Sequence, residues 1–255
     1  MNMKKVIGLS LTGVMLFSNA AFAAEVVNTM EAIKTVPSIA ALQPLEKVNA
    51  VIDKEIKFED KFVKYDIRLP EIQGLEDIIY QEQLNYIILS HAMEDIESVK
   101  SQAEELAAAS EENGWEFRPF EISIDYEIKS NDGILSLVVN TYTMTGGANG
   151  ITRVDCYNID TKENRKIELK DLFKDDVDYK EIVNKEIYKQ IEEQKQKENK
   201  EYFEGELGFK TISDLQTYYI QDGNLVIVFP EYSIAPGSMG TPEFRINLEG
   251  LEGLK

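Results

Sequence analysis

Apolar and polar residues alternate along several stretches of the chain. Alternation with a period of two is typical of half-buried β-strands. It predicts two strands around 55–69, with "FEDKF" as the turn between them and Pro70 at the end of the second. A further strand follows from residue 120. The alternating positions are Ile56, Phe58, Phe62, Tyr65, Ile67 and Leu69, and then Phe120, Ile122, Ile124, Tyr126 and Ile128.

Two other stretches have apolar residues at three- and four-residue steps, which predicts amphipathic helices. The first helix is expected over 74–109, with Gly114 as a left-handed cap. The second is expected from Tyr179. The predicted buried stripes are Leu75, Ile79, Tyr86, Leu89, Met93, Ile96, Ala103 and Leu106 in the first helix, and Tyr179, Val183, Ile187 and Ile191 in the second.

Turn signals separate the remaining strands. "NDG" at 131–133 and Asp222-Gly223 predict hairpins. The segments "ILSLVVNTYTM", "ITRVDCYNID", "LVIVF" and "EFRINL" are expected to be strands in a meander. Antiparallel strands that alternate with helical regions favour the α+β class, with helices packed on one face of an antiparallel sheet.

The N-terminus has the pattern of a secretory signal peptide. Two lysines precede a short apolar run, and Ala21-Phe22-Ala23 forms an A-x-A site. We expect residues 1–23 to be the signal peptide, cleaved between Ala23 and Ala24, and residues 24–54 to be a leader segment. The chain is then secreted and has no transmembrane anchor. An uncleaved N-terminal anchor is the open alternative.

The chain is strongly acidic, with 46 Asp and Glu against 27 Lys and Arg. Removal of residues 1–23 takes away two lysines and no acidic residue, which changes the net charge from −19 to −21. Binding to nucleic acid depends on basic residues that neutralise phosphates, so this balance argues against nucleic acid. It argues equally against anionic lipid. It favours a basic partner or simply a solvated surface.

The chain contains one cysteine and one histidine, which excludes several kinds of site. Cys156 has no intrachain partner for a disulfide, and we expect it to be buried in a strand. His91 alone cannot supply a zinc site with several imidazoles, and we expect it on a helix surface. A calcium site made of carboxylates alone is an open alternative on so acidic a chain, although no D-x-D-x-D-G loop is present to support it. The sequence therefore predicts no catalytic residue, no metal and no cofactor.

The segment "YTMTGGANG" at 142–150 allows a phosphate cradle, a tight turn or a partner surface. Phosphate loops lead from a strand into a helix, whereas this loop joins two expected antiparallel strands. No Lys-Ser/Thr pair follows it. The phosphate reading is therefore poor, and a bend permitted by glycine remains.

Most of the mature chain resembles a known family. "YTMTGGANGITRVDCYNIDTKENRKIELKDLF" and "LVIVFPEYSIAPGSMGTPEF" are similar to the DUF3298 signature, with its G-G-A-H-G loop, Y-N-x-D motif and Y-x-I-A-P loop. "KYDIRLPEIQGLEDIIYQEQLNYII" is similar to DUF4163. We expect a DUF4163-like region at 55–130 and a DUF3298-like region at 131–255, together in one compact unit.

The resemblance implies a module of the bacterial cell envelope. Family members include extracytoplasmic halves of lysozyme-binding anti-sigma factors, modules of cell-wall polysaccharide deacetylases, and short secreted proteins. We expect a free-standing module of the last kind. The two loops imply the partner-binding candidates. These are Gly146, Gly147, Ala148, Asn149, Gly150, Tyr232, Ile234, Ala235, Pro236, Gly237 and Ser238.

Two positions depart from the family pattern. Asn149 stands where the loop motif usually has His, and Gly237 stands where an aromatic usually follows the Y-x-I-A-P loop. Aromatic side chains often dominate interface energy, so the second change removes a typical contact residue. The glycine at 237 therefore argues against lysozyme as the specific partner.

Three functions remain open at this point. The first is a secreted, non-catalytic module that binds or inhibits lysozyme or a related basic wall hydrolase, since an acidic chain attracts a basic partner. The second is an enzyme on wall glycans that uses paired carboxylates. The third is a peptidoglycan-binding accessory protein that stacks sugars on aromatic side chains. The available aromatics are Trp115, Tyr142, Tyr157, Tyr218, Tyr219 and Tyr232.

Overall fold

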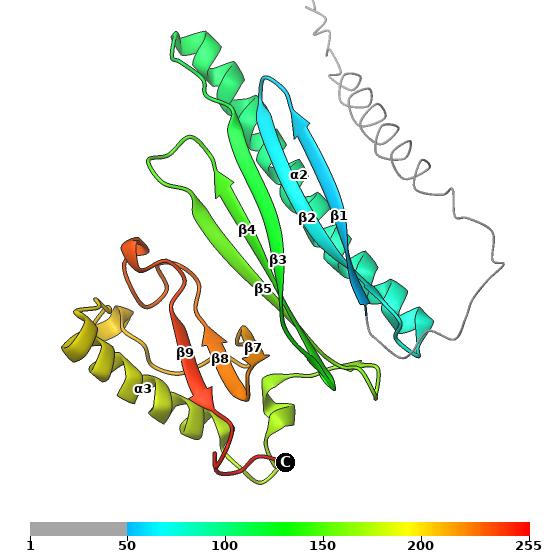
Figure 1. The fold of residues 1–255 in the computed structure, drawn as a ribbon. Coiled ribbons are helices and arrows are strands. Elements are labelled where there is room, and N and C mark those ends of the chain that lie inside the picture. The colour runs from blue at the N-terminus through cyan, green and yellow to red at the C-terminus, as the bar shows by residue number, and fades with distance from the viewer. Residues whose placement is uncertain (1–49) are drawn as a thin grey trace, which may run out of the picture. The chain divides into compact units, whose positions relative to one another are not determined.

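Six strands form one twisted sheet in sequence order (Figure 1). The computed structural model describes residues 50–255. The predicted signal peptide, its cleavage pair and leader residues 24–49 lie outside the described residues. The strands are β1 (Ala50–Glu59), β2 (Val63–Gln73), β3 (Phe120–Asp132), β4 (Ile134–Met144), β5 (Ile151–Asp160) and β6 (Arg165–Lys166).

The pairing of this sheet is antiparallel except between β2 and β3. These two strands run parallel, with Val63 opposite Phe120. Parallel neighbours need a crossover connection, and helix α2 (Ile78–Asn113) supplies it. The expected purely antiparallel sheet is therefore a mixed one. β1 also begins at Ala50, so the end of the predicted 24–54 leader belongs to a strand.

Pro70 lies inside β2 and does not end it. β2 continues to Gln73, and Pro70 pairs with Asp53 of β1. β3 pairs with β2 only over 63–67, so one edge of β2 is open at Pro70. A residue without an amide hydrogen is tolerated in a strand at such an edge.

Helix α2 begins four residues later than predicted, and its buried face matches the predicted stripe only in part, at Ile96 and Ala103. Asp77 caps it by accepting from the Tyr80 amide at 3.0 Å, and Gly114 ends it with φ 71°. Ile79 and Tyr86, both assigned to the buried stripe, are 72% and 71% exposed. The buried positions are Gln81, Leu84, Ile88, Ala92, Ile96, Val99, Ala103 and Ser110. The helix is therefore apolar on two faces. The face that contains Leu84 and Ile88 packs against β2 and β3, and the face that contains Ile79 and Tyr86 is exposed.

A second, smaller sheet contains β7 (Tyr218–Gln221), β8 (Asn224–Val228) and β9 (Glu243–Asn247). The predicted hairpin at Asp222-Gly223 is confirmed, with both residues at positive φ. Helix α3 (Tyr179–Glu198) buries Val183, Ile187 and Ile191 as predicted. Short 3-10 helices lie at Leu169–Leu172, Gly205–Leu207 and Gly237–Met239.

The two sheets and two helices stack in layers. One core cluster joins α2 to β2, β3 and β4. Val138 on the opposite face of β4 packs with Tyr219, Val226 and Val228 of the small sheet. The other face of the small sheet forms a cluster with α3. The layer order is α2, large sheet, small sheet, α3. The α+β class is confirmed, and each helix covers a different sheet.

A buried polar network ties the two sheets together. Ser136 donates to Asn158 Oδ1 at 2.6 Å, and Asn158 Nδ2 donates to the Tyr218 carbonyl at 2.7 Å. The Ile220 amide donates to Ser136 Oγ at 3.1 Å. Buried polar groups are costly unless paired, so this network favours one relative position of the sheets.

Neither described helix has the combination of length and hydrophobicity that a membrane span requires. This finding covers residues 50–255 only.

Candidate functional site

Two loops that lie about 80 residues apart in the sequence meet at one hydrogen bond. The first is residues 145–150, between β4 and β5, and the second is residues 229–242, between β8 and β9. The Thr152 amide, just after the first loop, donates to Glu231 Oε1 of the second at 3.0 Å. We call the surface formed by these loops and Tyr142 the two-loop site.

A glycine at the end of the first loop packs against the ring of Tyr142 on β4. Tyr142 lies opposite Thr152 in the β4–β5 ladder. A Cβ placed on Gly150 would lie 2.3 Å from the Tyr142 ring, closer than any real side chain can approach. Gly150 therefore leaves the space that the ring fills, and this explains a glycine at the end of "GGANG". Gly146 has a different role, because its φ of 81° favours glycine.

The second loop repeats the arrangement with Tyr232 and Gly237. A Cβ on Gly237 would lie 2.1 Å from the Tyr232 ring. Tyr232 has φ 61°, an uncommon conformation for a residue with a side chain. Its ring is 52% exposed. An aromatic at 237 would displace Tyr232, so the exposed aromatic of this loop is Tyr232 itself.

The structure divides the predicted site residues into surface and core. Gly146, Gly147, Ala148 and Asn149 form the exposed part of the first loop, and Ser238 is exposed in the second. Ile234 and Ala235 are buried in the cluster under α3, at 5% and 1% exposed. They anchor the loop and are not available to a partner. Pro236 is half-buried and precedes the 3-10 helix at Gly237–Met239.

The two-loop site contains no basic residue. Segments 142–151 and 229–242 hold one charged side chain, Glu231. On the neighbouring strand β3, Ser123 lies opposite Tyr142, while Glu121 and Asp125 flank Ser123 by alternation on the same face. Arg68 pairs with Asp125 at 2.6 Å, so Glu121 and Glu231 are the remaining acidic side chains around the half-buried Tyr142 and the exposed Tyr232.

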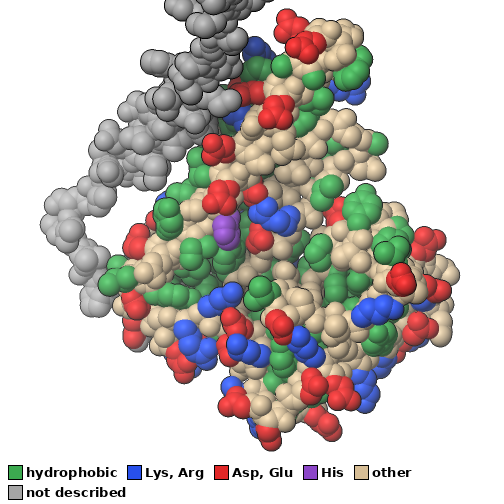
Figure 2. All heavy atoms as spheres, turned by 180° about the vertical axis from the view of Figure 1, so that it is seen from behind, with side chains coloured by type: hydrophobic (Ala, Val, Ile, Leu, Met, Phe, Trp, Pro, Cys, Tyr) green, Lys and Arg blue, Asp and Glu red, His purple; other side chains and the backbone are tan. Residues whose placement is uncertain are grey.

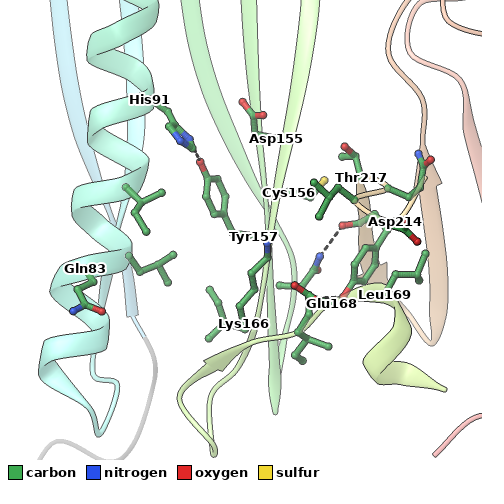
Figure 3. Close-up of a pocket in the computed structure, with 18 of the residues that line it drawn as sticks. Gln83, His91, Asp155, Cys156, Tyr157, Lys166, Glu168, Leu169, Asp214 and Thr217 are labelled. Carbon is green, nitrogen blue, oxygen red and sulfur yellow. Dashed lines mark hydrogen bonds between the residues drawn. The ribbon is translucent and has the colours of Figure 1, made fainter. Parts of the chain in front are cut away.

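A groove of about 390 Å³ lies elsewhere, between the flank of α2 and β5 (Figure 3). His91 of α2 and Tyr157 of β5 point toward one another, and His91 Nδ1 and Tyr157 Oη share a hydrogen bond of 3.0 Å. Burial raises the pKa of Tyr157. His91 is exposed as predicted, and the sequence alone does not indicate its bond to β5.

An ion-pair cluster also joins α2 to β5. Arg153 donates from both terminal nitrogens to the Asp95 carboxylate, at 2.7 and 2.6 Å, and from Nε to Asp155 at 2.8 Å. These hydrogen bonds, the Asp95 pair first, raise the pKa of Arg153. Figure 2 shows acidic and basic side chains beside the histidine on this face. The cluster is a structural link, because Arg153 is already satisfied by two carboxylates.

The described residues offer no group of three or more His, Cys, Asp or Glu placed to hold a metal ion. Cys156 is half-buried against the small sheet, and this burial raises the pKa of its thiol to about 12. A thiol with so high a pKa is a poor nucleophile at neutral pH.

Comparison with known proteins decides the family. The chain is 33% identical over 205 residues to the "Anti-sigma-V factor RsiV" of Bacillus subtilis strain 168, which covers 78% of this chain and 68% of that protein. The family model "Protein of unknown function (DUF3298)" matches residues 170–249, and "Deacetylase PdaC" matches residues 56–152. The chain belongs to the DUF3298/RsiV-type family.

Solved structures agree with the fold. A DUF3298-family protein of Bacteroides fragilis superposes with a TM-score of 0.63 at 18% identity, over 82% of this chain and 96% of its own. A DUF3298-family protein of Pseudomonas aeruginosa PAO1 gives a TM-score of 0.52 at 16% identity, over 83% of this chain and 94% of its own. The resemblance to DUF3298 is thus confirmed, and the one to DUF4163 stays a prediction.

The two matched regions both contribute to the two-loop site. The first loop falls inside the match at 56–152, and the second inside the match at 170–249. The predicted boundary at 130/131 falls in the β3–β4 hairpin, and all described residues, 50–255, fall in one compact unit.

Proposed function

We propose that this protein is an extracytoplasmic binding module of the bacterial cell envelope, without catalysis of its own, and that the two-loop site binds its partner. The observation that carries the proposal is the Thr152–Glu231 hydrogen bond, which links two loops that each pack a glycine against a tyrosine, the half-buried Tyr142 of β4 and the exposed Tyr232. Exposed aromatic rings on a fixed backbone are the usual centres of binding energy at protein interfaces.

The backbone of Tyr232 supports a binding role for this loop. A left-handed conformation at a residue with a side chain costs about 1–2 kcal/mol. Strain of this kind persists where the surrounding structure fixes it, and it clusters at ligand-binding sites. Because the strained residue is also the exposed aromatic, its conformation supports the proposal that Tyr232 contacts the partner.

The partner that fits best is a basic protein. The chain has a net charge of −19, and the two-loop site has no lysine or arginine. A basic partner would be steered toward such a surface. Lysozyme, or a related basic wall hydrolase, is our specific candidate, in keeping with the resemblance to lysozyme-binding anti-sigma modules. The similarity to an anti-sigma factor fits a role in sensing such a hydrolase or in inhibiting it.

A calorimetric titration of lysozyme into the protein at low ionic strength tests this proposal. We expect saturable binding that weakens steeply as salt is added, because the attraction between exposed charges is screened. Cytochrome c, a basic protein of similar size, is the control for attraction by charge alone. Absence of binding at low salt, or equal binding of both proteins, would contradict a specific lysozyme site.

A glycan ligand is the alternative, since exposed tyrosine rings also stack on sugars and one matched family model is named for a deacetylase. Sedimentation of the protein with purified peptidoglycan separates the two functions. Retention on peptidoglycan without lysozyme binding would favour a glycan-binding accessory protein. Release of soluble glycan fragments or acetate in the same mixture would instead indicate an enzyme.

A further inference from the structure

Strand β5 has an open edge next to the groove. Its pairing with β4 runs from Ile151 to Asp160, whereas β6 pairs with it only at Ile159 and Asp160. Over residues 151–158, no strand from the described part of the chain pairs with the other side of β5. An unpaired edge of this kind is a template for a further strand.

The hydrogen-bonding groups that face outward can be assigned from two neighbours. Ile167 donates to the Asn158 carbonyl at 2.8 Å, and the Thr152 amide donates to Glu231 at 3.0 Å. Both contacts lie on the side away from β4. Since the groups of successive strand residues point to alternate sides, those of Val154 and Cys156 also point outward. Two residues thus offer their amides and carbonyls at this edge.

The groove beside this edge is suited to the side chains of an added strand. Its lining includes Tyr157 of β5, Ile87 of α2 and Leu215 across the edge. Ile87 and Leu215 are 44% and 83% exposed, so apolar surface is available on both rims. Exposed apolar residues gathered around one groove mark an interaction site rather than scattered surface residues.

The charge of the chain, rather than that of the groove alone, favours a basic occupant. Asp155, Glu168 and Asp214 line it together with one lysine, Lys166. Arg153 neutralises part of the charge of Asp155, and Lys170 and Lys180 pair with Glu168 and Asp214. These pairs balance the acidic side chains of the groove, so the preference for a cationic segment comes from the net charge of the whole chain, −19.

We propose that β5 is a docking edge for an extended, basic segment of a partner protein. The segment adds as a strand that exchanges hydrogen bonds with Val154 and Cys156, and every second side chain enters the groove toward Ile87 and Leu215. Such β-strand addition takes affinity from the backbone and selectivity from alternate side chains. The edge is a second contact surface beyond the two-loop site, and its occupant need not be lysozyme.

A defined peptide probes the edge directly. The probe is a fluorescein-labelled peptide of alternating valine and lysine, compared with the same peptide N-methylated at every second residue and with a valine–glutamate peptide. We expect the first to bind at least about tenfold more tightly than either of the others. Equal affinity of the methylated and unmethylated peptides, or no binding of the valine–lysine peptide, overturns strand addition.

Amide hydrogen exchange by NMR localises the effect. Upon binding, the Val154 and Cys156 amides should exchange at least about tenfold more slowly, while the Asp155 amide, already paired with β4, should not change. Protection at the first loop instead of at these residues would overturn the proposal. Neither result depends on lysozyme binding, so failure here and failure of the two-loop site are distinguishable.

Two substitutions complete the test. Val154→Pro removes an outward amide without removing a bond to β4, and Leu215→Ser removes apolar surface on the rim. Each should weaken peptide binding about tenfold or more, whereas Leu207→Ser, at a leucine that is 71% exposed outside the groove, should not. Circular dichroism checks folding, and Leu215→Ser serves alone if the proline variant unfolds. A dimer of the free protein that Val154→Pro dissociates would identify a second copy as the occupant and overturn the proposal.

Discussion

Strands β3 and β8 are built from similar apolar residues but are buried differently. In β3 the side chains at 120, 122, 124 and 126 are buried, and most residues between them face solvent. In β8 the consecutive residues Leu225 to Val228 are all at most 1% exposed. The reason is position in the stack, because β8 lies between α3 and the large sheet while β3 has a helix on one face.

The comparison explains what the small sheet does for the site. It is a buried layer that contacts the large sheet on one side and α3 on the other. The second loop leaves this layer at Phe229, which is itself buried. The loop is therefore held by the most enclosed part of the molecule while Tyr232 remains at the surface.

The largest expected effect comes from truncation on both faces of β8. Val226→Ala and Ile227→Ala should each lower the free energy of unfolding by about 2–4 kcal/mol, because each leaves a cavity on its own side of the layer. In β3, Ile124→Ala should cost a similar amount, and the neighbouring Ser123→Ala should change stability by less than about 0.5 kcal/mol. Urea unfolding measures all four. A small effect of Val226→Ala would contradict the two-sided burial of β8.

The polar network between the sheets should have the next largest effect. Asn158→Ala leaves the Tyr218 carbonyl and Ser136 without the partner that they share. Loss of a partner from a buried polar group costs about 1–3 kcal/mol. The double variant Ser136→Ala/Asn158→Ala should be less destabilised than the sum of the single variants, since the groups are coupled. Additive costs in urea unfolding would contradict a network.

The backbone of Tyr232 predicts an inverted order of stability. Tyr232→Gly should be more stable than Tyr232→Ala by about 1 kcal/mol, because glycine adopts the left-handed conformation without strain. At an ordinary loop position alanine would be the better residue. Thermal unfolding of the two variants provides the measurement, and an alanine variant of equal or greater stability would show that φ at 232 is not strained.

Ionisation of Cys156 is expected to have the smallest effect on the free energy of unfolding at neutral pH. Its reactivity reports on the contact between the two sheets, where it is partly buried. Burial raises the pKa of its thiol from an ordinary 9.0 to about 12. Between these values the unfolded chain loses the proton that the folded state keeps, so the free energy of unfolding should fall as pH rises through this range. At pH 8, iodoacetamide should label the native protein far more slowly than the unfolded chain. Equal rates would mean that the sheets separate readily.

Local chemistry made much of the fold predictable. Gly114, Gly133 and Gly223 stand at positive φ where the turns and the helix cap were expected. The stripe of α3 was correct because that helix has one apolar face. The stripe of α2 was correct at Ile96 and Ala103, which are buried. It was wrong at Ile79 and Tyr86, which lie on a second apolar face that nothing described covers. Periodicity indicates that a helix is amphipathic, and it cannot choose between two apolar faces.

The arrangement of the strands could not be predicted from the sequence, because it depends on contacts between residues that lie far apart in the chain. The parallel β2–β3 pair and the separation into two sheets follow from the path of α2 and from the fit of Val138 against Val226 and Val228. The candidate site was predictable as two loops. Their meeting at Thr152 and Glu231 was not, and neither was the burial of Ile234 and Ala235.

The family signature is largely structural in this protein. Tyr157 and Asn158 link β5 to α2 and to the small sheet, and Asp160 accepts from the amides of the next turn. Asp171 Oδ2 accepts from the Glu168 amide at the start of a 3-10 helix. These roles maintain the stack that brings the loops together. The signature thus predicts the fold more strongly than the partner.

Two exposed tyrosines allow the central claim to be tested with a matched pair. Lysozyme should be titrated calorimetrically into the wild-type protein, Tyr232→Ala and Tyr86→Ala, where Tyr86 is exposed on α2. If the two-loop site binds the partner, Tyr232→Ala should weaken binding by about 2 kcal/mol, and Tyr86→Ala should leave it unchanged within about 0.5 kcal/mol. Equal binding by all three proteins, or a loss confined to Tyr86→Ala, would contradict the assignment of the two-loop site.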